Sequence, residues 1–246
     1  MRIKVLFSGL VAAALLVVAA SLDSMSWLMG VLTAVLQLIF AYTWPRMVRS
    51  DAPWPITIIL ALCSLAATAS TMFMPGGSVM SHSVEAIAVG VLLVFISQVL
   101  RGAEAEGRLA GVVSGVTGIV LGVLGSAWAA SAYVPYGFGL TVTTVIALLG
   151  AGAVAVTRLP NRMTMILAPV VAAALGAASS ALPMDMLWYQ GAILGLLTGL
   201  LVGSLRALAL VSRSVRNLSG ILGLTCAILL MSGAVSWYAM EVLAFI

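Results

Sequence analysis

Nine long apolar runs, separated by short breaks, constrain this chain more than any other feature of its sequence. A helix that crosses a bilayer needs ~20 mostly apolar residues, and continuous rather than alternating runs favour helices over strands. Because a bilayer has no water to satisfy backbone groups, only helices or closed barrels can span it. The sequence therefore predicts an all-α integral membrane protein, a nine-span transmembrane helix bundle with spans near 5–21, 25–43, 55–74, 85–100, 109–134, 137–157, 163–182, 186–211 and 218–240.

The composition leaves no stretch for a separate soluble domain. Only 7% of the 246 residues are charged, and the mean hydropathy is +1.23. A soluble domain carries roughly 25% charged residues. We therefore expect residues 1–246 to form a single polytopic transmembrane domain.

The first stretch, "MRIKVLFSGLVAAALLVVAAS", has the charged start and apolar centre of a secretory signal peptide. The next residues, "AASLDS", match the small-residue cleavage pattern poorly. The sequence therefore favours an uncleaved first span, with a signal peptide as the alternative.

The basic residues fall only in alternate breaks between the runs. Loops rich in Lys and Arg stay in the cytoplasm, so this pattern predicts a cytoplasmic N-terminus and an external C-terminus. The same pattern accounts for the net charge of +4 without a nucleic-acid partner, and membrane lipids become the expected partners. The basic residues are Arg2, Lys4, Arg46, Arg49, Arg101, Arg108, Arg158, Arg162, Arg206, Arg213 and Arg216.

The amino-acid composition also indicates the kind of organism that the chain comes from. Lys4 is the only lysine, all other basic residues are arginines, and Ala, Gly and Val are abundant. This bias is typical of a GC-rich bacterial genome. We therefore expect a multi-pass protein of a bacterial plasma (inner) membrane.

The sequence lacks the residues of several kinds of catalytic site. The single histidine, His82, lies in a predicted outer loop, which excludes an H-E-x-x-H zinc site and a Ser-His-Asp triad within the membrane. There is no G-x-S-x-G motif, and the one lysine stands too near the N-terminus for a P-loop. Cys63 and Cys226 lie within apolar runs, where cysteine behaves as a small hydrophobe. We expect no catalytic residue, no metal and no cofactor.

Four polar residues are candidates for a site at the outer face. Fifteen uncharged residues separate Glu85 from Arg101, about 22 Å of helix against a hydrocarbon core of about 30 Å. Glu85 therefore either dips below the interface as a substrate or proton contact beside His82, or stays in the headgroup layer of a short helix, which the sequence favours. The outer-face candidates are His82, Glu85, Asp185 and Glu241.

Gln37 and Gln98 are the main polar side chains predicted within the spans. Side chains of this kind bond across helices in a membrane, with an average contribution of about 0.6 kcal/mol. Hydrogen bonding between helices is therefore the favoured role, and a pore or substrate contact at the deeper Gln37 is the alternative. Pro169 predicts a kink in the seventh span, which we interpret as a packing device rather than a gate.

Four arginines near the predicted inner interface are candidates for contact with a lipid phosphate. Arg206 stands about two helical turns inside Arg213. Its long side chain either snorkels to the interface, which the sequence favours, or binds a phosphate together with the others. The set is Arg101, Arg108, Arg206 and Arg213.

Glycines recur every three or four residues in the fifth and eighth spans, so they share one helix face. Small faces let helix backbones approach closely in lipid, and the seventh span offers Ala168, Ala172 and Gly176 at the same interval. We expect these three spans to form the tight centre of the bundle, with an oligomer seam or an acyl-chain groove as alternatives. The packing glycines are Gly111, Gly115, Gly118, Gly122, Gly191, Gly195, Gly199 and Gly203.

These observations support two principal functions. A permease-like protein that translocates or handles a lipid or small hydrophobic substrate fits the many spans and the lack of catalytic residues. A non-catalytic subunit or assembly factor of a larger membrane complex, or a homo-oligomer, fits the glycine-rich faces equally well. A membrane enzyme would need acids or metal ligands that this sequence does not assemble.

Overall fold

The described part of the chain is helical throughout and contains no strand. The computed structural model describes residues 2–22, 25–73, 80, 82–102, 107–182, 186–211 and 217–243, with the backbone alone for 2–6 and 208–211. Its helices are α1 (Arg2–Ala20), α2 (Ser26–Met47), α3 (Pro53–Phe73), α4 (Ser83–Val99), α5 (Arg108–Leu124), α6 (Ala127–Ser131), α7 (Gly137–Val156), α8 (Asn161–Ala178), the 3-10 turn η2 (Ser179–Ala181), α9 (Trp188–Val211) and α10 (Leu218–Leu243).

Seven of these helical segments are long and apolar enough to cross a membrane: α2, α3, the α5–α6 segment, α7, α8, α9 and α10. Shorter apolar helices lie at Phe7–Ala20 in α1 and at Ser83–Val99, which is α4. The chain is therefore an all-α, multi-pass membrane protein. Each of the nine predicted runs contains a helix, which confirms the helical reading of the continuous apolar pattern.

Two differences from the expected helix bounds affect the packing: the end of α2 and the division of the fifth run. α2 continues to Met47, past Trp44 and Pro45, and Trp44 Nε1 donates a hydrogen bond to Ser114 O (2.9 Å) that ties this last turn to α5. The fifth run is divided, since α5 ends at Leu124 and the short α6 follows a turn. That turn is a Gly–Ser pair, 125–126, a common site of helix breaks.

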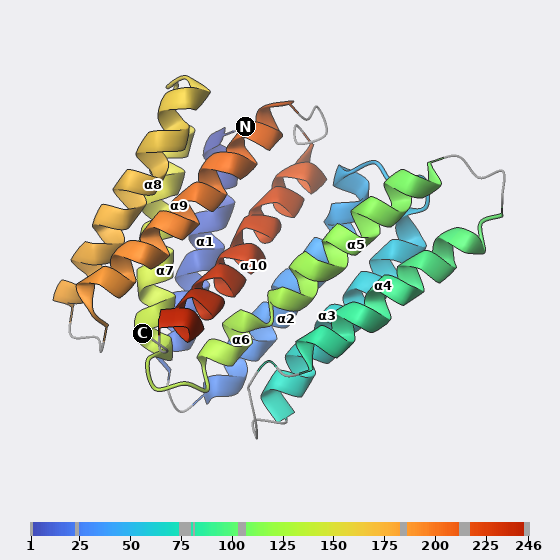
Figure 1. Ribbon diagram of the computed structural model, residues 1–246, viewed down its shortest axis with the longest axis horizontal. Coiled ribbons are helices and arrows are strands. Elements are labelled where there is room, and N and C mark those ends of the chain that lie inside the picture. The colour runs from blue at the N-terminus through green and yellow to red at the C-terminus, as the bar shows by residue number, and fades with distance from the viewer. Residues whose placement is uncertain are drawn as a thin grey trace.

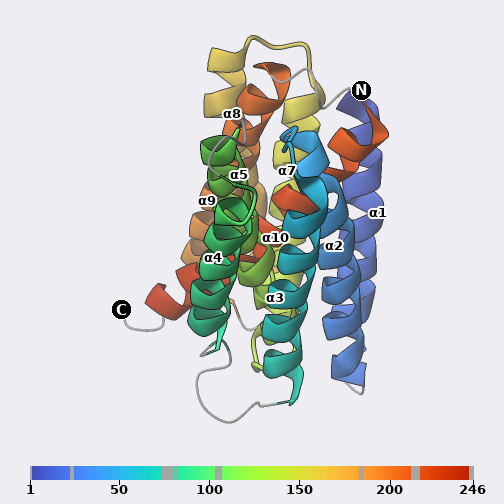
Figure 2. The same ribbon diagram turned by 90° about the vertical axis from the view of Figure 1, so that its right-hand side faces the viewer.

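The helices form two groups joined by α1 and α10 (Figures 1 and 2). In one group α5 packs against α4, α3 and α2, and in the other α9 packs against α8 and α7. α10 contacts α2, α5 and α6 on one side and α9 on the other, while α1 contacts α7, α10 and α2. The largest fully buried side chains include Trp128, Phe40 and Leu16.

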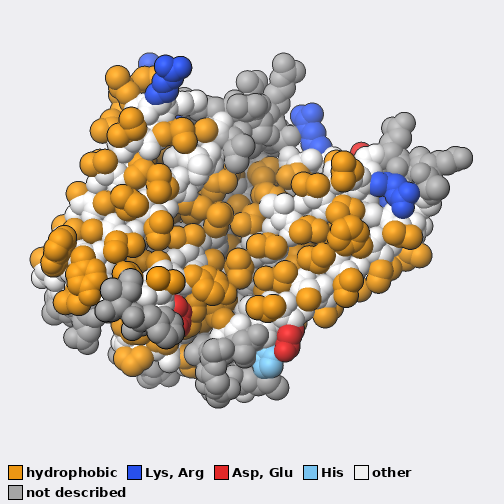
Figure 3. Space-filling view, in the orientation of Figure 1, with side chains coloured by type: hydrophobic (Ala, Val, Ile, Leu, Met, Phe, Trp, Pro, Cys, Tyr) orange, Lys and Arg blue, Asp and Glu red, His pale blue; other side chains and the backbone are white. Residues whose placement is uncertain are grey.

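The surface of the bundle separates apolar sides from charged ends. Figure 3 shows hydrophobic side chains over the flanks, with Lys and Arg groups along one end and the His side chain at the opposite end. α1 and α10 both begin at the end that carries the Lys and Arg groups (Figures 1 and 3). This is the distribution that a bilayer favours, because charged groups are expensive in its core.

Candidate functional site

α8 and α9 pack backbone against backbone. A Cβ atom added at Gly195 would lie 2.6 Å from the carbonyl carbon of Ala172, and one at Gly199 would lie 2.5 Å from Pro169 Cα. Real Cβ atoms essentially never approach other atoms so closely. Glycine is therefore required at both positions by the close approach of the two helices. Pro169 lies inside α8 and takes part in this contact directly.

The close contact covers only part of the glycine series in α9. At the N-terminal end of α9, a Cβ at Gly191 would lie 2.8 Å from the carbonyl carbon of Gly176. Toward the other end, a Cβ at Gly203 would lie 3.6 Å from Met165 Cα, an ordinary van der Waals distance. The two helices thus diverge between Gly199 and Gly203.

The glycine face of α5 is filled by side chains instead. A Cβ at Gly118 would lie 2.8 Å from Cδ1 of the Trp44 indole. Side-chain atoms are also the nearest neighbours of the other three predicted positions: Gly111 faces Gln98, Gly115 faces Val94 and Gly122 faces Ser64.

The expectation that the fifth, seventh and eighth spans form one tight centre is wrong. α5 packs mainly against α4 and α3, and α10 lies between α5 and the α8–α9 pair (Figure 1). The spacing of glycines identifies a helix face made of small residues, but it does not identify the residues that pack against that face. Here large side chains of α2, α3 and α4 cover the face of α5, whereas α8 meets α9 through small residues of its own.

Gln37 connects three helices at the centre of one helix group. Its side chain is fully buried, Nε2 donates a hydrogen bond to Gly122 O in α5 (2.9 Å), and Oε1 accepts one from Thr68 Oγ1 in α3 (2.8 Å). The hydroxyl of Ser64, buried beside Gly122, has no hydrogen-bond partner within the described residues. In this structure Gln37 therefore holds α2, α3 and α5 together.

Gln98 brings two of the candidate arginines together at the end of α4. Its side chain is 2% exposed, and its Oε1 accepts a hydrogen bond from Arg101 Nη1 (2.9 Å). Its backbone carbonyl accepts another from Arg108 Nε (3.2 Å). Arg213, the fourth candidate for a lipid phosphate, lies outside the described residues.

Arg206 is turned toward protein groups. Its side chain is 9% exposed, Nη2 donates to Leu159 O (2.9 Å) and Thr157 O (3.3 Å), and Nη1 donates to the hydroxyl of Thr164. These partners belong to the turn between α7 and α8 and to the first turn of α8. Arg206 of α9 thus fastens that turn, a role the sequence pattern does not reveal.

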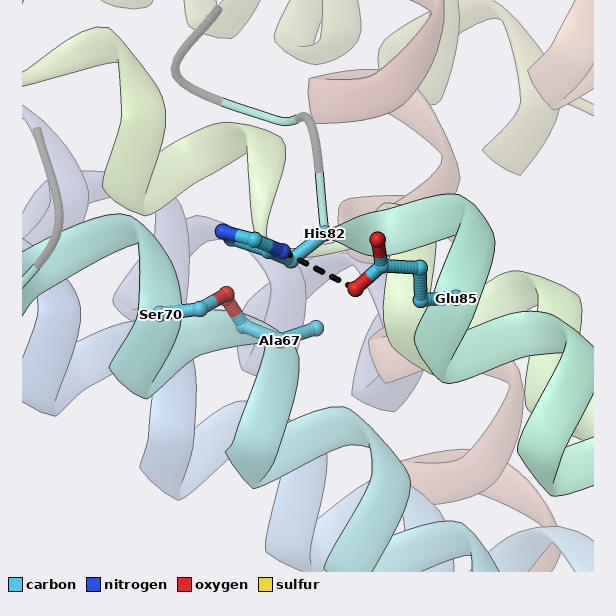
Figure 4. A network of polar contacts seen from close by, with 4 residues as sticks. All are labelled: Ala67, Ser70, His82 and Glu85. Carbon is cyan, nitrogen blue, oxygen red and sulfur yellow. Dashed lines mark hydrogen bonds and ion pairs between the residues drawn. The ribbon is translucent and has the colours of Figure 1, made fainter. Parts of the chain in front are cut away.

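His82 and Glu85 form an exposed pair at the start of α4. His82 Nδ1 lies 2.9 Å from Glu85 Oε2, and Figure 4 shows the two side chains facing each other. The side chains are 45% and 73% exposed. A pair this exposed contributes little to stability, typically about 0–1 kcal/mol.

The other outer-face candidates do not join this pair. Glu241 lies in the last turn of α10, and α5 separates α10 from α4 (Figure 1). Burial, and secondly the charge of Glu241, raise the pKa of Tyr136 at the start of α7. Asp185 lies outside the described residues.

Trp128 is a structural residue that sequence reasoning missed. It is 1% exposed, and its Nε1 donates to Leu229 O in α10 (2.7 Å). A Cβ at Gly233 would lie 2.6 Å from Cδ1 of its indole. The available signal is a tryptophan just after the Gly–Ser break, because an indole N–H buried in an apolar region needs an acceptor.

Two buried hydroxyl pairs around α7 were also missed. Thr143 Oγ1 lies 2.8 Å from Ser179 Oγ of η2, and Thr144 Oγ1 donates to Ser236 Oγ of α10 (2.7 Å). Such pairs satisfy polar groups that would otherwise be unpaired in an apolar interior. The closely spaced threonines of "LTVTT" in α7 are the sequence signal for them.

α10 is central in the bundle yet has one side that is less buried than the rest. Its less buried apolar residues Ile228, Met231, Val235, Tyr238 and Val242 follow each other at intervals of three or four, so they share one face. α10 lies between α9 and α5 in Figure 1, and Figure 3 shows the apolar surface set back there. We call this stripe, with its flanks on α9 and α5, the α10 groove.

Among the described residues, no three His, Cys, Asp or Glu side chains are placed to hold a metal ion. Cys63 and Cys226 are buried free thiols in different helices.

The chain was compared with protein-family models, curated proteins and solved structures, and none of them matches it.

Proposed function

We propose that the chain crosses a bacterial plasma membrane nine times, with its N-terminus in the cytoplasm and its C-terminus outside. The short helices α1 and α4 lie alongside the longer ones (Figures 1 and 2), which supports counting them as spans. The gathering of Lys and Arg at one end (Figure 3) supports the orientation.

Labelling of single cysteines in intact cells tests this topology. In a background without Cys63 and Cys226, we expect His82→Cys to react with a membrane-impermeant maleimide from outside. Arg158→Cys, in the turn between α7 and α8, should react only after the cells are permeabilised. Labelling of both positions from the same side would exclude the proposed arrangement.

For function, we propose a permease-like protein that translocates or handles a lipid or small hydrophobic substrate. The α10 groove is the observation that carries this proposal. It gives a central helix an apolar face open to the side of the bundle, where an acyl chain can enter from the bilayer without crossing a polar barrier. An apolar concave surface of this kind is the default location for a hydrophobic ligand.

A lipid-scrambling assay tests the groove. The purified protein is reconstituted into vesicles with a fluorescent phospholipid, and quenching from outside reports the exchange between leaflets. We expect the wild type to accelerate exchange, Val235→Trp in the groove to slow it, and Leu92→Trp on the exposed face of α4 to leave it unchanged. An absence of acceleration by folded wild-type protein would argue against the proposal.

The alternative is a non-catalytic subunit or assembly factor of a larger membrane complex. One observation favours it: Gln37 and Gln98, the polar side chains predicted inside spans, both bond to groups of the protein. Purification in mild detergent with mass spectrometry separates the two functions. A stoichiometric protein partner would favour the alternative, and a retained lipid without a protein partner would favour lipid handling.

A further inference from the structure

An arginine stacked between two aromatic rings stands where α2 ends and α3 begins. The guanidinium carbon of Arg46 lies 3.7 Å from the ring centre of Tyr42 and 4.9 Å from that of Trp54. Its Nη1 donates to Tyr42 O and, at 3.5 Å, to Thr57 Oγ1, whereas Nε and Nη2 donate to no atom of the described residues. Tyr42 and Trp54 are 51% and 61% exposed. The arginine is thus held in place with donors still available.

The end of α2 places a second arginine in a conformation that favours glycine. Ser50 N donates to Pro45 O (2.9 Å) and Arg49 N to Arg46 O (3.3 Å), the two bonds of a Schellman motif. Arg49 has φ +55°, and it is the only residue other than glycine with positive φ in the described ranges. Glycine would relieve the strain of its Cβ. An arginine retained there points to a use for its charge.

The carboxylate of the nearby Asp51 points toward the start of α5 rather than toward Arg46. Asp51 is the only acidic residue between α2 and α3, and its carboxyl carbon lies 3.0 Å from where a Cβ on Gly107 would stand, at the start of α5. It forms no ion pair with Arg46 in the described structure. The turn between α2 and α3 therefore presents uncompensated positive charge.

Exposed apolar side chains continue from this charged turn along both helices. Val35 and Leu38 of α2 are each 46% exposed, and Ile58 and Leu62 of α3 are 55% and 61% exposed. A phosphate bound at the turn would therefore have apolar surface beside it for attached acyl chains. This continuity distinguishes a phospholipid from a free phosphate as the ligand.

We propose that the α2–α3 turn binds the phosphate of an anionic phospholipid. Arg46 and Arg49 pair with the phosphate oxygens, since a guanidinium offers a fork of donors that matches a phosphate. Tyr42 and Trp54 hold Arg46 at headgroup depth, and the acyl chains lie along α2 and α3. Retention of a bound lipid requires neither translocation nor a particular orientation, so this site stands or falls independently of the proposed function.

The amount of phospholipid that the purified protein retains tests the proposed site. The protein is exchanged into vesicles of equal parts phosphatidylglycerol and phosphatidylcholine, extracted in mild detergent, and its bound lipids are counted by native mass spectrometry. We expect the wild type to retain phosphatidylglycerol in preference, and Arg46→Gln to lower that retention by about tenfold, the effect of losing charge-assisted hydrogen bonds. Arg158→Gln, an exposed arginine of another turn, serves as the matched control and should retain lipid like the wild type.

Arg49→Gly gives a readout that a merely structural role would not produce. Because glycine suits the left-handed backbone, this variant should unfold at a higher temperature and yet retain less phosphatidylglycerol. This variant also keeps the test open if Arg46→Gln does not fold. Undiminished retention by Arg49→Gly, or by a folded Arg46→Gln, would overturn the proposal, as would displacement of the lipid by inorganic phosphate.

Discussion

The α8–α9 contact and the glycine face of α5 carry the same sequence signal but are built differently. In α9, Gly195 and Gly199 stand against the backbone of α8, where every neighbouring atom is fixed by the helix itself. In α5, Gly118 and Gly122 stand against the ends of side chains from neighbouring helices. The backbone atoms of a helix cannot shift individually to make room for a new methyl group, whereas a side chain can change its rotamer. Glycine is therefore indispensable in the first region, whereas in the second it is replaceable at Gly122, where a Cβ would press only on the hydroxyl of Ser64.

The two regions also differ in how polarity is used. The face of α5 receives hydrogen bonds from Gln37 and Trp44 onto its backbone carbonyls. The α8–α9 contact has its polar fastening at one end, where Arg206 binds the turn that precedes α8. One region is thus held by bonds through its centre, and the other by close packing with a polar clamp.

The largest predicted effect comes from Gly195→Ala. The added methyl group would overlap the backbone of Ala172, so α8 and α9 must separate along their length. Overpacking of this kind costs about 1–3 kcal/mol, and we expect the upper part of that range because no side chain can move aside. Thermal unfolding in detergent measures the loss.

Gly203→Ala is the matched control in the same helix. Its Cβ would lie 3.6 Å from Met165 Cα, an ordinary contact, so we expect no loss of stability and a gain of up to about 1 kcal/mol from helix propensity. Equal destabilisation by the two substitutions would mean that the close contact of Gly195 with α8 does not determine the outcome, because alanine favours a helix over glycine at both positions.

Arg206→Met should have the next largest effect. The substitution keeps an unbranched apolar stem but removes the guanidinium that donates to Thr157 O and Leu159 O. Hydrogen bonds to charged groups contribute about 1.5–3 kcal/mol, so we expect a loss of about 2 kcal/mol and faster hydrogen exchange in the α7–α8 turn.

Arg158→Met is the control for that measurement, since Arg158 is exposed in the same turn. If Arg206→Met unfolds at the same temperature as the wild type but retains less phospholipid, Arg206 binds a lipid phosphate rather than stabilising the α7–α8 turn.

The helices were predictable from the sequence because a bilayer enforces them. Continuous apolar runs leave the backbone no partners except its own, so the helices of all nine runs follow from local pattern alone. The partners of each helix do not follow in this way. Gly122 and Gly195 have similar local surroundings in the sequence, and only the packing of distant segments decides that one meets Ser64 and the other meets Ala172.

The polar residues show the same limit. Gln37 is recognisable as a buried amide, but its acceptor in α5 lies 85 residues away and has no sequence signature of its own, since it is a backbone carbonyl. Trp128 and Arg206 also bond to backbone carbonyls. A sequence therefore identifies the donors of such bonds more readily than their roles.

Gln37→Leu tests whether hydrogen bonds hold the α2–α3–α5 group. The substitution leaves Gly122 O and the Thr68 hydroxyl without their partner. Bonds between helices in a membrane average about 0.6 kcal/mol, so we expect a loss of about 1 kcal/mol for the two. Thermal unfolding of Gln37→Leu, Thr68→Val and the double variant gives the coupling between the residues. Additive losses would show that Gln37 and Thr68 do not stabilise each other.

Gly122→Ala should have the smallest effect, and it tests the comparison most directly. The new methyl group would meet the hydroxyl of Ser64, which has no hydrogen-bond partner to lose in the described structure. A rotation of Ser64 places that hydroxyl within reach of a carbonyl of its own helix, a common serine bond. Alanine also favours a helix over glycine by about 0.8–1.0 kcal/mol. We therefore expect Gly122→Ala to unfold within about 1 kcal/mol of the wild type, and Gly122→Ala combined with Ser64→Ala to unfold no earlier. A loss as large as that of Gly195→Ala would mean that the α5 face is as rigid as the α8–α9 contact, and the distinction between the two regions would fail.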